Sequence, residues 1–253
     1  MTTQLVLSFV SGIMISGLAA YLGTLMLSRR MSVVAGPLAH LAFPGVAIAI
    51  VCGFDLALGV FPFLLLGAVL IWLLELKTKL PMENLSAVIF AVGVGSSLLF
   101  LPIGQAEVAL VGNIMQISLL ETALIVTFST ITYFVVRKMY NRIMLINIHE
   151  DLVKVEKKNI AFYNLGYLLA IAVVVALGVY LVGGLITAAL IAVPAGASRN
   201  VSKSLPQYKF WAVLFGALGT IAGIILSLVL HLLTGPMIIV SDALIFLISL
   251  FLV

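Results

Sequence analysis

The chain has few charged residues, and this scarcity limits the class of protein it can be. Of its 253 residues, 9% are charged and 64% are apolar. Soluble globular domains carry roughly a quarter charged residues. The composition therefore excludes a soluble domain and predicts an integral membrane protein.

Cysteine is almost absent, with Cys52 the only one in the chain. An internal disulfide is impossible, and a metal centre built from cysteine thiolates is not expected, because such centres use several thiolates. Metal chemistry would have to use histidine, carboxylates, carbonyl oxygens or water. We expect no resident cofactor.

Motifs for catalysis and nucleotide binding are also missing. No lysine follows a glycine, so the Gly-Lys-Ser/Thr core of an ATP-binding P-loop is absent. The chain also lacks a Ser-x-Gly elbow and a His-Glu-x-x-His motif. The sequence therefore predicts that the chain is not an enzyme, and that any ATP-driven step belongs to another subunit.

Apolar runs long enough to cross a membrane recur along the whole chain. Crossing a hydrocarbon core takes roughly 17 to 25 residues of helix. The runs lie near residues 5–27, 38–54, 56–74, 84–101, 118–136, 161–182, 184–198, 210–232 and 237–253. They predict an all-α, polytopic bundle of eight or nine transmembrane helices that forms one transmembrane domain over residues 1–253.

The cations fall on alternate connections between these spans. They are Arg29, Arg30, Lys77, Lys79, Arg137, Lys138, Arg142, Lys154, Lys157, Lys158, Arg199, Lys203 and Lys209. Cationic loops remain in the cytoplasm, so we expect a multi-pass protein of the cell inner membrane with its N-terminus outside and its C-terminus cytoplasmic. Membrane lipid then explains the composition, and the net charge of +4 requires no nucleic acid partner.

The longest polar stretch, residues 137–160, is predicted to be a cytoplasmic loop. Its apolar residues recur at a spacing that also fits a short amphipathic helix. A solvated connector and such a helix both remain open.

Proline and glycine interrupt several spans. Gly36-Pro37 and Pro44-Gly45 flank the start of the second span, and further sites are Gly183-Gly184, Pro194 and Gly235-Pro236. Broken helices are tolerated at membrane depth where the freed backbone faces protein or a water-filled cavity. The pattern therefore predicts helix breaks in a transport pathway and favours a transporter or channel over a passive membrane subunit.

Two ionisable residues, His40 and Asp242, are predicted to lie at membrane depth, where such residues are costly and often functional. His40 lies ten residues after Arg30, which places it about 15 Å into the bilayer. Neutral imidazole binds zinc and other first-row metals, although a histidine bonded to a carbonyl is equally open. Asp242, near the outer end of the last span, could also line a metal or translocation pathway, but we expect an interfacial carboxylate paired with a hydroxyl.

The segment around His40 resembles a known family. Arg29-Arg30-Met31-Ser32 followed by Leu38-Ala39-His40-Leu41-Ala42-Phe43-Pro44-Gly45-Val46 is similar to the opening signature of zinc- and manganese-uptake permeases of bacterial ABC transporters. The stretch from Val182 to Ala195 and the turn Leu233-Thr234-Gly235-Pro236 resemble later segments of the same family. These matches are ordered and spaced as in the family, and together with the hydropathy profile they cover essentially the whole chain.

The resemblance implies a permease that imports a divalent metal by alternating access, in two copies. It also implies an ABC ATPase on the cytoplasmic side and an extracytoplasmic metal-binding protein. The family's ATPase-coupling loop corresponds to residues 195–207. We expect Arg199 and Lys203, four residues apart, to lie on one face of a short docking helix.

One position departs from the family. Its members usually have Asp four residues before the histidine, which places carboxylate and imidazole on one helical face. Here that position is Gly36. Alternatives therefore stay open: an ABC permease for another solute such as a metal chelate, or a transporter or channel driven by an ion gradient.

Overall fold

The computed structural model describes residues 2–28, 35–98, 114–148 and 157–252, and within these ranges the chain is helical with short connections and no strands. The helices are α1 (Thr2–Ser28), α2 (Ala35–His40), α3 (Ala42–Cys52), α4 (Leu56–Thr78), α5 (Met82–Leu98), the 3-10 turn η1 (Ile114–Gln116), α7 (Leu119–Ile148), α9 (Lys157–Val182), α10 (Gly184–Val201), α11 (Leu205–Leu230) and α12 (Thr234–Ser249). The all-α prediction is confirmed.

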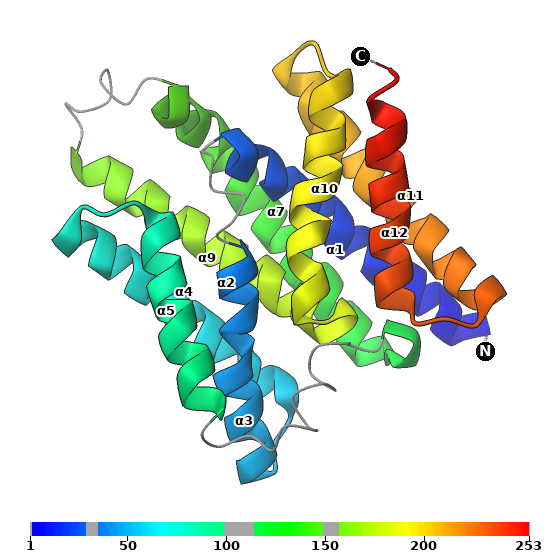
Figure 1. Ribbon diagram of the computed structural model, residues 1–253, viewed down its shortest axis with the longest axis horizontal. Coiled ribbons are helices and arrows are strands. Elements are labelled where there is room, and N and C mark those ends of the chain that lie inside the picture. Colours follow the sequence, from blue (N-terminus) through cyan, green and yellow to red (C-terminus); the bar gives the residue numbers. More distant parts are fainter. Residues whose placement is uncertain (1, 29–34, 99–113, 149–156, 253) are drawn as a thin grey trace.

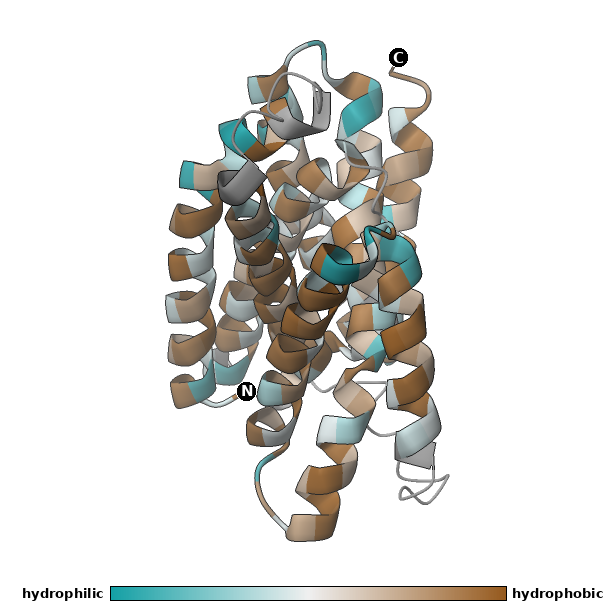
Figure 2. Ribbon diagram, turned by 90° about the vertical axis from the view of Figure 1, so that its left-hand side faces the viewer, coloured by the Kyte–Doolittle hydropathy of each residue, from teal (hydrophilic) through white to brown (hydrophobic). Residues whose placement is uncertain are grey.

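Successive helices run in opposite directions between two ends of the bundle, and the N- and C-termini lie at opposite ends (Figure 1). Because α2 and α3 together make one broken crossing, the described residues make nine crossings. Six segments are long and apolar enough to span a membrane, and two shorter apolar helices accompany them. Figure 2 shows apolar residues along most of the helical length and hydrophilic residues mostly toward helix ends.

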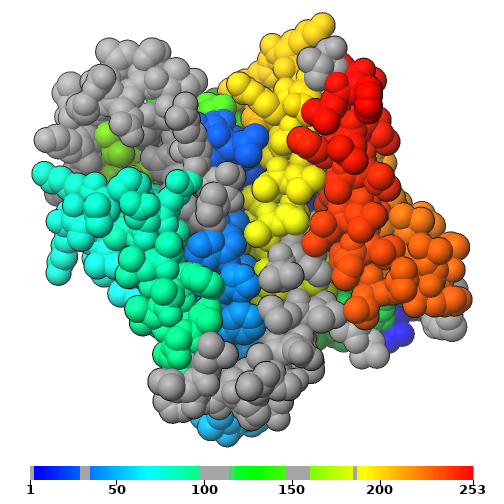
Figure 3. Space-filling view, in the orientation of Figure 1, coloured from blue at the N-terminus to red at the C-terminus, as the bar shows by residue number. Residues whose placement is uncertain are grey.

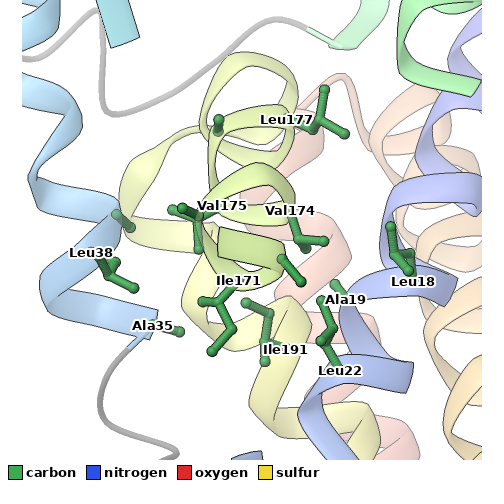
Figure 4. Close-up of a cluster of buried hydrophobic side chains, with 14 of the residues drawn as sticks. Leu18, Ala19, Leu22, Ala35, Leu38, Ile171, Val174, Val175, Leu177 and Ile191 are labelled. Carbon is green, nitrogen blue, oxygen red and sulfur yellow. The ribbon is translucent and has the colours of Figure 1, made fainter. Parts of the chain in front are cut away.

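The centre of the bundle is formed by α1, α9 and α10. α1 packs against α7, α9, α10 and α11, and α10 packs against α1, α2, α9, α11 and α12. Figure 4 shows side chains of α9, among them Ile171 and Val175, between Leu38 of α2 and Leu22 of α1. On one side, α4 packs against α9 and against α3 and α5; on the other, α11 and α12 pack together.

Small and hydroxyl side chains let α1 approach its neighbours. Ser8 donates a hydrogen bond to the carbonyl oxygen of Ile114 at 2.7 Å. A Cβ added at Gly12 would lie 2.8 Å from the Cγ2 atom of Thr220 on α11. Small residues permit close helix contacts in membranes, and here they join α1 to η1 and α11.

Two predicted helix ends are wrong. The predicted loop 137–160 is largely helical: residues 137–148 belong to α7, and α9 begins at Lys157. The rest of the predicted loop, residues 149–156, lies outside the described residues. Pro194 lies inside α10 without ending it. A membrane helix tolerates an internal proline when its surroundings satisfy the freed backbone group.

The predicted break at Gly183-Gly184 is present. Gly183 separates α9 from α10 and has a φ angle of 100°. Glycine adopts this conformation without steric cost because it has no Cβ. A single residue therefore reverses the chain between two central helices.

α3 and α4 approach backbone to backbone at Gly45 and Gly59. A Cβ added at Gly45 would lie 2.5 Å from the carbonyl oxygen of Gly59, and one at Gly59 would meet the carbonyl oxygen of Gly45. Backbone atoms cannot move aside as the end of a flexible side chain can. The two helices can therefore pack at this distance only with glycine at both positions.

We expect Gly59→Ala to force α3 and α4 apart and to destabilise the purified protein by about 1–3 kcal/mol, the usual cost of overpacking. Thermal unfolding in detergent measures the loss. Gly95→Ala on α5 is the matched control, because a Cβ there meets nothing within 4 Å. Equal unfolding temperatures for the two variants would contradict the close approach of α3 and α4.

Candidate functional site

The second crossing is broken at Leu41, directly after His40. Leu41 N–H donates to the carbonyl oxygens of Pro37 at 3.2 Å and Leu38 at 3.1 Å, which closes the last turn of α2. In a continuous helix, the N–H of residue 44 would bond to the His40 carbonyl, but proline has no N–H. Pro44 therefore frees the His40 carbonyl oxygen from its helical bond and explains why α2 ends there.

The glycines and prolines that were predicted to break this crossing all lie inside helices. Gly36 and Pro37 belong to the first turn of α2, and Pro44 and Gly45 belong to the first turn of α3. Proline is tolerated in a first turn because its missing N–H has no helical partner there. The break lies at Leu41, between the two pairs and within neither of them.

His40 is half-buried and lies among aromatic rings. Its imidazole stacks on Phe43 with 5.5 Å between ring centroids and an interplanar angle of 15°, and it lies 5.2 Å from the ring of Phe90 on α5. His40 is the sixth of the 18 residues of the broken crossing Ala35–Cys52. Its expected depth of about 15 Å depends on residues 29–34 as well, which lie outside the described residues.

Gly36 shares the half-exposed face of α2 with His40. The two residues are four apart, and side chains at this spacing lie on the same helical face. A Cβ added at Gly36 meets nothing within 4 Å. The position where relatives are expected to carry a carboxylate is therefore open beside His40.

The structure does not bring Asp242 to His40. α10 lies between α2 and α12, as Figures 1 and 3 show. Within the part of the chain that the structure describes, no three His, Cys, Asp or Glu side chains gather so as to hold a metal ion. His40 is therefore the only predicted metal ligand on the open face of α2.

The expectation of an interfacial Asp242 paired with a hydroxyl is wrong. Asp242 lies in the middle of α12 and is 1% exposed. Neither of its carboxyl oxygens has a hydrogen-bond partner among the described residues. The neighbouring Ser241 hydroxyl donates instead to the carbonyl oxygen of Met237 at 2.9 Å.

The predicted coupling segment 195–207 is mostly helical. α10 continues to Val201 and α11 begins at Leu205, which leaves residues 202–204 as the connection. Arg199 is exposed in the last turn of α10, with its guanidinium 5.8 Å from the ring centroid of Tyr208. Lys203 follows the C-cap of α10, so the expected docking helix with both cations on one face is not formed.

A set of contacts near the coupling segment was not foreseen from the sequence. The Lys209 ammonium lies 4.5 Å above the ring centroid of Tyr140, and the Tyr140 hydroxyl hydrogen-bonds the Thr24 hydroxyl at 2.8 Å. These residues come from α11, α7 and α1, so no local pattern joins them. They hold the start of α11 against the centre of the bundle.

A second unforeseen contact lies at the opposite end of the bundle. Tyr180, near the end of α9, donates a hydrogen bond to Glu121. Glu121 also accepts from the backbone N–H of Ser118 at 2.6 Å, and its own N–H donates to the Ser118 hydroxyl. Ser118-x-x-Glu121 is a capping box, a signal that could have placed the start of α7.

All 253 residues match the model of the ABC 3 transport family. The chain belongs to that family. It is a membrane-spanning permease subunit of an ABC transporter, and such subunits transport rather than catalyse. Membership of the ABC 3 transport family decides against the alternative of a carrier or channel driven by an ion gradient.

Similar permeases occur in several bacteria. The chain is 25% identical to the high-affinity zinc uptake system membrane protein ZnuB of Haemophilus influenzae, over 96% of this chain and 95% of that protein. It is 20% identical to the manganese import system permease protein ScaB of Streptococcus gordonii, over 96% of this chain and 89% of that protein.

Two solved structures share the fold of this member of the ABC 3 transport family. PsaBC from Streptococcus pneumoniae, in complex with Fab, matches with a TM-score of 0.78 at 20% identity, over 96% of this chain and 89% of that chain. An inward-facing transporter described as of the metal-chelate ABC type matches with a TM-score of 0.79 at 15% identity, over 97% and 85% of the two chains. At these identities the likeness concerns the fold.

We expect Gly36→Asp to leave the fold intact and to raise the affinity of the purified permease for Zn²⁺ by about tenfold or more, equivalent to ~1.4 kcal/mol. The new carboxylate would join the His40 imidazole on one face of α2. Calorimetric titration measures the affinity. Gly95→Asp is the control, because Gly95 is equally open. Equal affinities in the two variants would show that residue 36 does not adjoin the imidazole.

Proposed function

We propose that this permease imports a divalent first-row metal, zinc or manganese, by alternating access driven by a separate ATPase. The observation that carries the proposal is His40 at the broken crossing, where Pro44 leaves the His40 carbonyl oxygen without its helical bond. Imidazole nitrogen and carbonyl oxygen both bind such metals. The zinc and manganese permeases among its relatives support the same cargo.

A metal chelate is the second candidate cargo. Gly36 removes the carboxylate expected beside His40 and leaves the α2 face open. A bare divalent ion loses a ligand there, whereas a chelate brings its own ligands and needs room. Comparing vesicle uptake of free zinc and manganese with uptake of their chelates separates the two candidates.

The orientation of the permease in the membrane is inferred from the positions of its lysines and arginines. The described lysines and arginines lie toward the end of the bundle that carries the C-terminus, on α4, α7, α9, α10, α11 and the connections 79–81 and 202–204. Cationic segments stay in the cytoplasm. We therefore assign this end, with the C-terminus, to the cytoplasm and the N-terminus to the outside.

The open face of α2 suits a second copy of the permease. α10 lies beside α2 on this face (Figure 3). Before its last turn, the half-buried residues of α10 are small, namely Ala188, Ala189, Ala192, Val193 and Gly196. Small faces allow close packing between helices in lipid. Two copies that meet here would place their His40 residues on facing surfaces, with the cargo path between them.

The ATPase and the delivery protein would bind opposite ends. The connection 202–204, flanked by exposed Arg199, projects at the cytoplasmic end and offers a docking surface to an ABC ATPase. Asp55 and Glu121 lie at the outer end, at the starts of α4 and α7. An extracytoplasmic metal-binding protein would deliver the ion at that end.

We expect His40→Ala to reduce ATP-dependent uptake of zinc or manganese at least about tenfold, since it removes the side-chain ligand at the break. Uptake of radiolabelled metal into vesicles that hold the permease with its ATPase measures the effect. His231→Asn is the matched control: His231 is exposed after α11 in a left-handed conformation that asparagine tolerates. Normal uptake by His40→Ala would remove His40 from the mechanism.

We expect the double change Arg199→Glu with Lys203→Glu to weaken ATPase binding roughly tenfold or more and to uncouple ATP hydrolysis from transport. The change replaces two positive charges with two negative charges at the proposed docking surface for the ATPase. Co-purification and coupled uptake assays measure both effects. Lys77→Glu with Lys138→Glu changes the net charge equally at the same end of the bundle. Unchanged ATPase binding in the first double variant would refute the docking assignment.

A further inference from the structure

Asp242 is an isolated carboxyl group sealed between helices. α12 packs closely on α11, where a Cβ at Gly223 would collide with backbone atoms of Ile238, a helical turn away from Asp242. At Gly219, an added Cβ would collide with Asp242 Oδ1 and would lie 2.8 Å from its Cγ atom. The carboxyl group therefore occupies the notch left by the missing side chain of Gly219.

The notch offers no compensation for a negative charge. Both carboxyl oxygens lack hydrogen-bond partners among the described residues. Burying an ionised carboxylate without a partner costs far more than burying the neutral acid, whose polar atoms cost only a few kcal/mol. The packing seen here therefore favours the protonated form.

Charged and titratable groups on the elements packed against α12 lie far from Asp242. On α11 these are Tyr208, Lys209 and His231, which are eleven, ten and twelve residues from Gly219. At 1.5 Å per residue, each is about 15 Å or more from the notch along the helix. On α10, Arg199 lies against Tyr208 at the same distant level. η1 carries no titratable group, and α12 carries none besides Asp242.

A metal ion does not fit this notch. Oxygen-binding cations take six or more ligands, and even four-coordinate metals need three protein donors or more. Asp242 has no hydrogen-bond partner within the described part of the chain, and its carboxyl group lies so close to Gly219 that no room is left between them. A proton needs neither space nor further ligands.

We propose that Asp242 is a proton-binding site of the permease. It holds a proton while α11 and α12 are packed as seen here, and it releases that proton to water when α12 moves away from Gly219. α12 is suited to such a movement because it packs mainly on α10 and α11, while Leu244, Leu247 and Ile248 are exposed. Coupling of the proton to alternating access rests on the proposed transport function; proton binding itself does not.

Infrared spectroscopy and thermal unfolding of the whole permease test the proton. Wild type should show the carbonyl band of a protonated carboxylic acid, and Asp242→Asn should lack it. Raising the pH favours ionisation, which the packing opposes. From mildly acidic to mildly alkaline pH, the unfolding temperature of wild type should therefore fall by about 3 °C or more relative to Asp242→Asn.

Asp55→Asn is the matched control, because Asp55 is an exposed N-cap whose carboxylate accepts from Ala57 N–H. This variant should keep the band and the pH dependence of wild type. Loss of the band in Asp55→Asn, or identical spectra and pH dependence for wild type and Asp242→Asn, would overturn the proposal.

A measurement on wild type guards against a variant that fails to fold. The protonated-acid band of the wild-type protein should be present at mildly acidic pH and should lose intensity as the pH rises and the acid ionises. A wild-type spectrum without such a band at mildly acidic pH would overturn the proposal. These tests need no cargo. A failure of metal uptake would therefore refute the proposed function without contradicting proton binding by Asp242.

In the assembled transporter, the Asp242→Asn variant should hydrolyse ATP with a flatter pH profile than wild type, because its neutral amide has no proton to release. A role limited to packing would change the rate of hydrolysis at every pH alike. Parallel profiles for the two proteins would therefore show that the proton is not coupled to the transport cycle.

Discussion

Backbone hydrogen bonding within the hydrocarbon layer is the constraint on which this structure depends. Every N–H and C=O group at membrane depth needs a partner inside the protein, and long apolar helices meet that need for most of the chain. The second crossing is not a continuous helix and does not meet this need in the same way. Pro44 cannot donate to His40, so α2 ends and the chain turns at Leu41 before α3 begins. The imidazole of His40 and a carbonyl oxygen without its usual helical donor thus occur together at the end of α2.

Close approach between helices then decides what surrounds the break. Glycine contacts hold α3 against α4 through Gly45 and Gly59, and α4 in turn packs on α9 in the centre of the bundle. The break is therefore not a loose kink: α3, which follows it, is fixed by backbone contact, and α2, which precedes it, packs against α9 and α10. Rigid flanks allow the half-exposed face of α2 to keep a constant geometry.

Much of this arrangement could be predicted from the sequence, because hydropathy and charge are local signals. The positions of the crossings were predicted from apolar runs, and the alternating direction of successive crossings was predicted from cations on alternate connections. The side of a helix that a residue faces did not follow, since it depends on partners far along the chain. Asp242 is buried only because Gly219, 23 residues earlier, leaves a notch for it. Lys203 is not helical, because α10 ends at Val201.

The two ionisable residues of the predicted pathway illustrate how burial separates roles within one bundle. His40 lies half-exposed beside an open position, so that an ion or a chelate could reach its imidazole from the α2 face. Asp242 lies beyond α10 and is closed off by α11, so that cargo on that face cannot reach its carboxyl group without separation of packed helices. The cargo path therefore needs no carboxylate from α12, and any effect of Asp242 on transport must arise through the packing of α11 against α12.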